Sequence, residues 1–402
     1  MSTPARPAVL GGEPAFGERL PLVRPTLEDV PGIAGQLESV LASGILTNGP
    51  TVRRLEEEVR DRLGVAHVVA VSSCTAGLML TYQALGVGRG SRVLLPSFTF
   101  AASAHAVAWT GADVDLCEVT EERCSLDVDD LEPRLADDGP PVAAVSATHV
   151  YGHPAEVEAL EALTAAHGIP VVYDAAHALG SARRGRPVGS FGTAEVFSLS
   201  PTKVVVAGEG GLVTTDDPAL AEAVRLGRDY GNPGDYDCRF PGLNARMSEL
   251  HAAIALASLA RVDEHVDRRI ELVSCFEAAL GDVTDLRVVR PAEGDRSTFK
   301  DLTLVAGEGF GLTALELQRA LAAEGIDSRR YYAPPIHQQA AYADRWPARR
   351  PLPVTDRLSA SVLSPPLWSH STAEQVTLVA TAIARLHHHA DEVAAALRAG
   401  PR

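Results

Sequence analysis

The stretches VVYDAAHALGS (residues 171–181) and FSLSPTKVVVAGEGGLVTT (residues 197–215) decide the fold of this 402-residue chain. In the first, an apolar run ends in Asp174. In the second, an apolar run ends in hydroxyl residues and then Lys203, 29 positions after the aspartate. Short apolar runs of this kind are typical of strands that are covered on both faces. We expect both side chains at the carboxyl ends of strands, where ligands of open α/β sheets gather.

A lysine and an aspartate placed in this way suit an enzyme that uses pyridoxal 5′-phosphate. The lysine amine forms a Schiff base with the cofactor aldehyde, and the carboxylate keeps the pyridine nitrogen protonated so that the ring accepts electrons. Asp174 could instead cap the following helix, and Lys203 could be a surface residue of a turn. Because a lysine next to an apolar strand is costly to bury without partners or function, the pair favours the cofactor site.

Short apolar runs alternate with helical patterns between residues 55 and 215, which predicts a mostly parallel sheet with crossover helices, an α/β fold. The expected strands are 67–72, 92–96, 114–119, 142–148, 170–173, 195–200 and 211–214, and the expected helices are 75–85, 101–110 and 156–167.

The second half of the chain has a different pattern. A long helical stretch covers residues 248–279, and a strand (299–305), a helix (314–324) and a closing helix (373–397) follow it. We therefore predict a large cofactor-binding domain with an N-terminal arm at residues 1–250. A smaller α+β domain should occupy residues 251–402.

Further candidate cofactor residues lie at other expected strand ends. Cys74 and Thr75 begin a helix, whose free N–H groups and neighbouring hydroxyls suit a phosphate, although they could simply cap it; Ser198 adds a hydroxyl. Phe100 could stack on a planar ring or pack in the core. His177, one helical turn after Asp174, could lie beside the pyridine ring or be an ordinary core histidine.

Composition limits the classes of function. The chain is 46% hydrophobic and carries a net charge of −16, which argues against nucleic-acid binding because phosphate contacts need clustered Lys and Arg. Five scattered cysteines have no metal-ligand spacing and fit free thiols in a reducing cytoplasm. The N-terminal residues lack the apolar region of a signal peptide, and no stretch approaches a membrane span.

Together these residues resemble the DegT/StrS family of sugar aminotransferases, which have the aspartate aminotransferase fold (pyridoxal phosphate fold type I). The resemblance covers nearly the whole chain and is carried by GILTNGPTVRRLEEEV, PSFTFAASAHAVAWTGADV, SATHVYGHPAEVEAL, YDAAHALGSARRGRPVGSFGTAEVFS, SPTKVVVAGEGG, NARMSEL and YYAPPIHQQAAY.

The resemblance implies specific roles. Lys203 would be the Schiff-base lysine and proton carrier. Asp174 would pair with the pyridine nitrogen, and Phe100 would stack on the ring. Thr75, its neighbours and Ser198 would hold the phosphate. Asn244, which sequence alone favours as a turn residue, would reach the phosphate of the partner subunit in an obligate homodimer with shared sites. Two positions depart from the common pattern: Cys74 stands where many members have Gly, and His177 where many have Gln.

The resemblance also implies a reaction. L-glutamate would give its amino group and leave as 2-oxoglutarate, and a nucleotide-linked keto-sugar would accept it, with C4 of dTDP-4-keto-6-deoxyglucose in antibiotic deoxysugar pathways as the preferred target. Amination at C3, of an aminocyclitol or of an aminobenzoate precursor is an alternative on the same scaffold, and a cofactor-bound regulatory protein is a third. Tyr332 and His337 are candidates for the sugar pocket.

Overall fold

Seven short strands form the central sheet of the structure, a computed structural model that describes residues 5–399. Their order across the sheet is β1-β9-β8-β5-β4-β2-β3, and all neighbours are parallel except β9, which is antiparallel to both β1 and β8. The predicted α/β class with a mostly parallel sheet is therefore confirmed. The strands are β1 (His67–Val71), β2 (Arg92–Pro96), β3 (Asp113–Cys117), β4 (Val142–Thr148), β5 (Val171–Asp174), β8 (Ala194–Ser198) and β9 (Gly211–Thr215).

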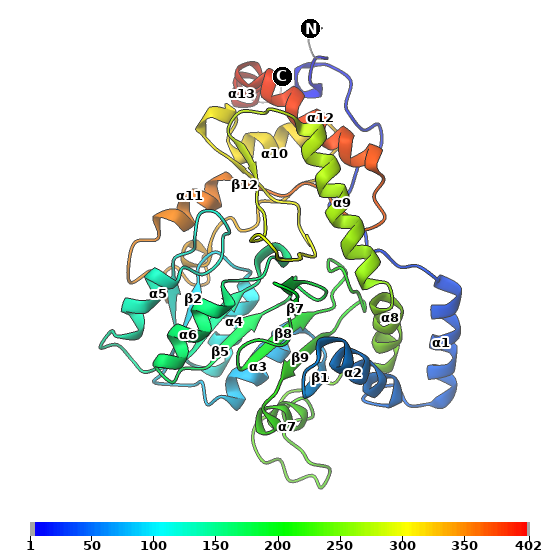
Figure 1. The fold of residues 1–402 in the computed structure, drawn as a ribbon, viewed down its shortest axis with the longest axis vertical. Coiled ribbons are helices and arrows are strands. Elements are labelled where there is room, and N and C mark those ends of the chain that lie inside the picture. The colour runs from blue at the N-terminus through cyan, green and yellow to red at the C-terminus, as the bar shows by residue number, and fades with distance from the viewer. Residues whose placement is uncertain (1–4, 400–402) are drawn as a thin grey trace.

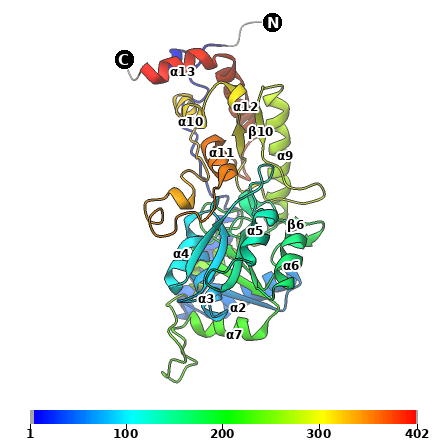
Figure 2. The ribbon, with the colours of Figure 1, turned by 90° about the vertical axis from the view of Figure 1, so that its left-hand side faces the viewer.

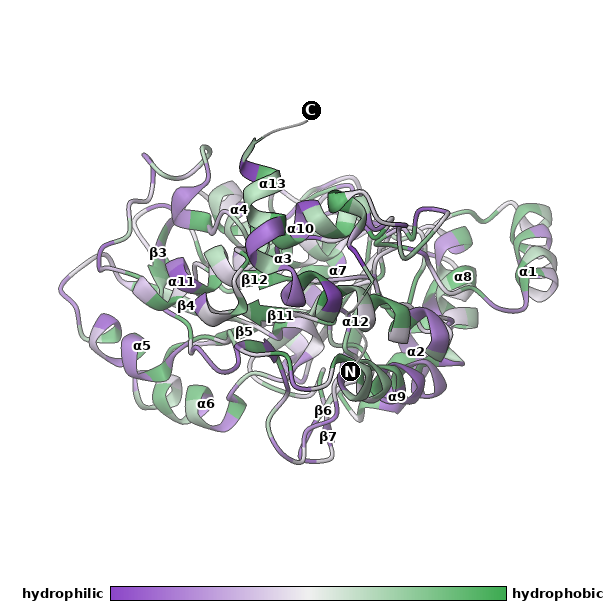
Figure 3. Ribbon diagram, turned by 90° about the horizontal axis from the view of Figure 1, so that it is seen from above, coloured by the Kyte–Doolittle hydropathy of each residue, from purple (hydrophilic) through white to green (hydrophobic). Residues whose placement is uncertain are grey.

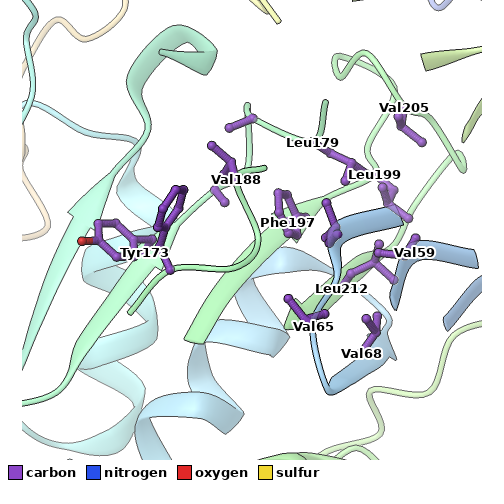
Figure 4. Packing of buried hydrophobic residues seen from close by; sticks show 14 of the residues in the cluster. Val59, Val65, Val68, Tyr173, Leu179, Val188, Phe197, Leu199, Val205 and Leu212 are labelled. Atoms are coloured by element: carbon purple, nitrogen blue, oxygen red, sulfur yellow. The ribbon is translucent and has the colours of Figure 1, made fainter. Parts of the chain in front are cut away.

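Both faces of this sheet are buried, and adjacent residues of a strand enter different cores. In β1, Val68 and Ala70 belong to one apolar cluster, whereas Val69 and Val71 belong to the other. Figure 4 shows the first cluster, in which Phe197 of β8 lies between side chains from several elements. This two-sided burial explains why the strands have near-continuous apolar sequences.

Helices cover each face of the sheet in a three-layer arrangement (Figure 2). The first core takes apolar side chains from α2, α6 and α8, and the second takes them from α3, α4 and α7. The helices of this lobe are α1 (Val30–Ser43), α2 (Pro50–Leu63), α3 (Cys74–Ala84), α4 (Ala101–Thr110), α5 (Val128–Leu135), α6 (Val157–Ala166), α7 (Pro218–Gly227) and α8 (Glu249–Leu259); a two-residue hairpin pairs β6 (Ala182–Arg183) with β7 (Arg186–Pro187).

A smaller lobe lies above the sheet in Figure 1 and has its own apolar core. Its three-stranded antiparallel sheet is β10 (Leu286–Val288), β11 (Leu304–Ala306) and β12 (Val362–Leu363). Its helices are α9 (Val262–Leu280), α10 (Ala314–Ala323), α11 (Pro353–Ser361), α12 (Ala373–His388) and α13 (Ala390–Ala399). Along the chain as a whole, short 3-10 turns occur at η1 (Ala8–Leu10), η2 (Val150–Gly152), η3 (Glu308–Phe310) and η4 (Ile336–Gln338).

Three predicted elements differ from the observed ones. The long helix at 248–279 is broken between α8 and α9, where the chain passes from packing on α1 and α2 to packing on α12. The closing helix is broken at His389. The predicted strand at 299–305 is reduced to β11, because the backbone carbonyls of residues 299 and 300 accept hydrogen bonds from the Arg269 side chain instead of pairing with a strand.

The division of the chain at residue 250 stays a proposal, and its outer limits, residues 1–4 and 400–402, lie outside the described part of the chain. Two segments pack in the lobe opposite to the one that this division assigns to them. The arm reaches the small lobe, where Glu324 accepts hydrogen bonds from the backbone N–H groups of Ala8 and Ala15, both at 2.9 Å, and α8 packs in the large lobe. Among residues 5–399, no helix combines the length and apolarity needed to cross a lipid bilayer.

Candidate active site

A cavity of about 320 Å³ opens at the carboxyl edge of the sheet, beneath the small lobe. The structure brings together seven of the eight cofactor residues expected from the sequence. They are Cys74, Thr75, Phe100, Asp174, His177, Ser198 and Lys203. The eighth, Asn244, lies outside this cavity.

Asp174 ends β5 at the floor of the cavity, with 3% of its surface exposed. Ser103 Oγ donates to its Oδ2 atom at 2.6 Å, and the backbone N–H of Ala176 donates to Oδ1 at 3.1 Å. The Cys74 thiol lies 3.9 Å from Oδ1, and burial followed by the Asp174 charge raises the pKa of this thiol well above its usual value. In the described part of the chain no Lys, Arg or His forms an ion pair with this carboxylate.

The N-terminus of α3 supplies the anion-binding end of the cavity. Ser73 caps the helix by accepting from the N–H of Ala76 at 3.1 Å, so the N–H groups of Cys74 and Thr75 stay at the cavity wall. A Cβ atom at Gly211 would lie 2.6 Å from the nitrogen of Cys74, and glycine therefore lets β9 approach the start of this helix. The helix dipole and free N–H groups favour a phosphate here.

Lys203 follows β8 in a turn in which its N–H bonds the Ser200 carbonyl at 3.0 Å. Burial, reinforced by the Lys300 charge, lowers the pKa of Lys203 to about 8. The sequence holds only two lysines among 36 Lys and Arg residues, and both line this cavity. An amine with this acidity is largely available as a nucleophile at mildly alkaline pH.

His177 lies beside the cavity in the segment that follows β5. Burial, followed by the charges of Lys203 and Lys300, holds the pKa of His177 well below its usual value, so the ring is neutral. Its Nδ1 atom is buried and has no hydrogen-bond partner among the described residues. The main-chain carbonyl of His177 accepts from Thr298 Oγ1 at 2.6 Å, which ties this segment to the small lobe.

Aromatic side chains form the rim. Phe100 is 59% exposed although it lines the cavity, and its ring centroid lies 6.4 Å from that of Tyr332. Tyr332 lines the cavity, whereas His337 lies outside it, bonded to Ser97 at 2.7 Å and to Asp356 at 3.0 Å. An exposed aromatic face at a cavity mouth is suited to stacking on a planar ring.

Asn244 lies on the surface, in the loop before α8. Its side chain is exposed, and its Oδ1 atom accepts from Arg246 at 3.2 Å. The partner-subunit role of Asn244 therefore stays a prediction.

Sequence reasoning missed several polar residues of this region, among them Ser103, Lys300 and Asp301. Ser103 lies in the first turn of α4, 71 positions before Asp174, so nothing local connected the two residues. Lys300 and Asp301 also line the cavity. The signal for these two was available, since a charged pair interrupts an otherwise strand-like stretch in STFKDLTLV (residues 297–305).

The donor set of this cavity fits pyridoxal 5′-phosphate. An amine of lowered pKa would hold the aldehyde carbon, a buried carboxylate without an ion-pair partner would hold the ring nitrogen, and a helix N-terminus with nearby hydroxyls would hold the phosphate. The exposed face of Phe100 would cover the ring.

Comparison with known proteins agrees with this geometry. Residues 30–384 match the model of the DegT/DnrJ/EryC1/StrS aminotransferase family. The erythromycin biosynthesis sensory transduction protein EryC1 of Saccharopolyspora erythraea is 35% identical over 368 residues, which cover 90% of this chain and 93% of that protein. The dTDP-3-amino-3,4,6-trideoxy-alpha-D-glucose transaminase of Streptomyces venezuelae is 34% identical, over 88% of this chain and 91% of that enzyme.

A solved structure of DesI, determined in the presence of its TDP-sugar product, is similar along almost its whole length. It superposes with a TM-score of 0.91 at 34% identity and covers 97% of this chain and 98% of that one.

Proposed function

Because this chain belongs to the DegT/DnrJ/EryC1/StrS aminotransferase family, we propose that it transfers an amino group from L-glutamate to a nucleotide-linked keto-sugar. The chain is a sugar aminotransferase that depends on pyridoxal 5′-phosphate. We propose C4 of dTDP-4-keto-6-deoxyglucose as the position aminated, in the biosynthesis of an antibiotic deoxysugar. The observation that carries the proposed amino transfer is the meeting of Lys203 and Asp174 in one cavity.

When bound, the cofactor supplies an electron sink that lets an amino group pass between an amino acid and a ketone. Lys203 Nζ would hold the cofactor and then carry a proton between two carbon atoms. The pKa of about 8 suits this task, because a general base works best when its pKa lies near the operating pH.

The other residues of the cavity would bind and orient. Asp174, fixed by Ser103 and Ala176, would keep a proton on the ring nitrogen. The neutral His177 ring would donate or accept a hydrogen bond without adding charge beside Lys203. The small lobe above the cavity would limit the access of water to the reacting atoms.

We propose a homodimer with shared sites. Helix α1 lies at the edge of the large lobe, packed on α8, and is largely apolar in Figure 3. Val30, Leu41, Ile45 and Leu46, in and next to this helix, are 63%, 58%, 49% and 48% exposed. Exposed apolar side chains in and next to one helix suit a subunit interface, and a second copy of the chain would cover them. The five free thiols fit a reducing cytoplasm, where we place the enzyme.

Amination at C3 is the second candidate, because two relatives of this chain have names that specify an amino group at position 3 of a sugar. The test is to incubate the purified enzyme with L-glutamate and a panel of dTDP-linked keto-sugars and to identify the products by mass spectrometry. We expect conversion of dTDP-4-keto-6-deoxyglucose to a 4-amino sugar. Conversion of a 3-keto-sugar alone would replace the C4 proposal, and no conversion of any sugar would overturn the proposed function.

A further inference from the structure

Lys300 and Asp301 form a second charged pair in the cavity that holds Lys203. Both are buried, with 8% and 7% of their surfaces exposed, and Lys300 Nζ donates to Asp301 Oδ1 at 2.8 Å. They belong to the segment between β10 and β11 that descends from the small lobe towards the sheet (Figure 1). Neither residue has a proposed contact with the cofactor, and Lys300 enters that proposal only through its effect on the pKa of Lys203.

Position 300 carries a compact ammonium group in a chain whose basic residues are almost all arginines. The one lysine apart from Lys203 occurs here. A guanidinium presents a planar fork that matches carboxylates and phosphates, whereas an ammonium is a small donor that suits single oxygen atoms. Lys300 also lies 4.9 Å from the centroid of the Tyr331 ring, which limits the space around it.

Asp301 provides the complementary group. Its Oδ2 atom is buried and has no hydrogen-bond donor among the described residues. A buried acceptor without a donor is destabilising, and more so when it is charged. Lys300 has three N–H donors, of which the bond to Asp301 uses one. The pair therefore presents an unsatisfied acceptor beside an available donor.

The segment that carries the pair is held firmly. Arg269, only 5% exposed, donates to the carbonyls of Phe299 at 2.9 Å and Leu367 at 3.1 Å and to Ser369 Oγ at 2.9 Å. The second cavity that touches the pair measures about 20 Å³. That space holds no more than a water molecule, so a larger ligand must reach the pair from the 320 Å³ cavity.

A hydroxyl group is the ligand that fits this arrangement, because it accepts from an ammonium and donates to a carboxylate. A carboxylate would meet the charge of Asp301, and an ammonium would meet that of Lys300. We propose that Lys300 and Asp301 jointly bind a ring hydroxyl of the sugar and so determine which sugar is accepted. This inference rests on the proposed function and adds the group that the site recognises.

Because Lys300 and Asp301 carry opposite charges, substitution of each in turn distinguishes a hydroxyl ligand from a carboxylate ligand. If the pair binds a hydroxyl, Lys300→Met and Asp301→Asn both weaken sugar binding. If instead it binds the carboxylate of the amino donor, Lys300→Met weakens L-glutamate binding, whereas Asp301→Asn, which removes a repelling charge, strengthens it. Asp327→Asn, which breaks a surface ion pair with Arg19, is the matched control.

The experiment measures the two halves of the reaction separately in the cofactor-loaded enzyme. Bleaching of the visible absorption band of the bound cofactor by L-glutamate reports the first half, in which L-glutamate gives up its amino group. Amination of dTDP-4-keto-6-deoxyglucose reports the second. Calorimetry with dTDP-6-deoxyglucose, which has a hydroxyl in place of the ketone, reports sugar binding without chemistry. A normal first half in a variant also shows that its site is folded.

We expect both variants to weaken sugar binding by about tenfold or more, the loss of a hydrogen bond to a charged group, and to change half-saturation by L-glutamate by less than about threefold. For the wild-type enzyme, removal of one ring hydroxyl from the sugar should cause a similar loss, and this loss should disappear in Asp301→Asn. Unchanged sugar binding, or opposite effects of the two variants on L-glutamate, would overturn the inference while leaving the proposed function intact. A wild-type enzyme that aminates no sugar would overturn both.

Discussion

The acidity of Lys203 follows from where its amine lies. Burial disfavours the charged form, and the neighbouring Lys300 disfavours it further, so the pKa falls from 10.5 to about 8. Below pH 8 the amine is mainly protonated, and above it the amine is mainly neutral and nucleophilic.

This acidity predicts a measurable pH profile. In the cofactor-free enzyme, acylation of Lys203 by an amine-reactive reagent should rise with pH to a midpoint near 8 and then level off. Mass spectrometry can assign the label because the chain has only two lysines. Lys300→Met should move the midpoint upward, since it removes a repelling charge. A rate that continues to rise beyond pH 10 would show an ordinary lysine.

Asp174 should matter for chemistry more than for attachment of the cofactor. Asp174→Asn keeps the volume of the side chain but removes the charge that would hold the ring nitrogen protonated. We expect amino transfer to fall by roughly 10²–10³-fold, with the cofactor still bound to Lys203 in the absorption spectrum. Ser103→Ala, which removes one hydrogen bond to this carboxylate, should cost about tenfold. Similar rates for Asp174→Asn and the wild type would contradict the assigned role.

At the scale of elements, the site depends on a close contact between a strand and a helix. The first residue of β9, Gly211, lies against the start of α3. Gly211→Ala would place a methyl group 2.6 Å from the Cys74 nitrogen, so the helix N-terminus must move. We expect the Kd of the cofactor to rise by about tenfold or more, because the phosphate loses aligned donors.

The control for this substitution is Gly88→Ala. Its added Cβ would have its nearest contact at 3.8 Å, an ordinary van der Waals distance. Cofactor affinity, measured by fluorescence titration of the cofactor-free enzyme, should therefore stay at the wild-type value. Equal affinities for both variants would show that the approach of β9 to α3 does not organise the phosphate end of the cavity.

A buried carboxylate joins α8 to the N-terminus of α2. Glu249, 1% exposed, accepts from the backbone N–H groups of Gly49, Thr51 and Val52 at 2.8, 2.8 and 2.9 Å. Glu249→Ala leaves these donors without a partner, and we expect the free energy of unfolding in urea to fall by about 2–4 kcal/mol. Glu264→Gln, on the surface of α9, should leave it unchanged. Equal stability of both variants would contradict a structural role for Glu249.

At the scale of the whole molecule, the proposed dimer makes each site depend on two chains. Lys203→Ala and Asn244→Ala should each be inactive alone. If the subunits exchange, half of the dimers are mixed and each contains one intact site, so the mixture should recover about a quarter of wild-type activity. Activity after mixing and size-exclusion chromatography check this prediction. No recovery despite proven exchange would place Asn244 in its own subunit's site or outside any site.

The parts of this molecule that local patterns determine could be predicted from the sequence. The strands were predictable because each is one contiguous apolar run. The Lys203–Asp174 pair was predictable because Asp174 ends one such run and Lys203 closely follows another. The contacts of Glu324 with the arm, of Ser103 with Asp174 and of Thr298 with His177 could not be predicted, because they join residues far apart in the chain. The predicted strand at 299–305 was mostly wrong because the backbone carbonyls of residues 299 and 300 bond the distant Arg269 side chain instead of a neighbouring strand.

The central claim, that Lys203 is the residue which holds the cofactor, can be tested by borohydride reduction of the cofactor-saturated enzyme and peptide mapping by mass spectrometry. Since the chain has only two lysines, the map has two possible side-chain sites. We predict the pyridoxyl mass on the peptide that contains Lys203 and an unmodified Lys300. A label on Lys300, or no label on either lysine, would contradict the account.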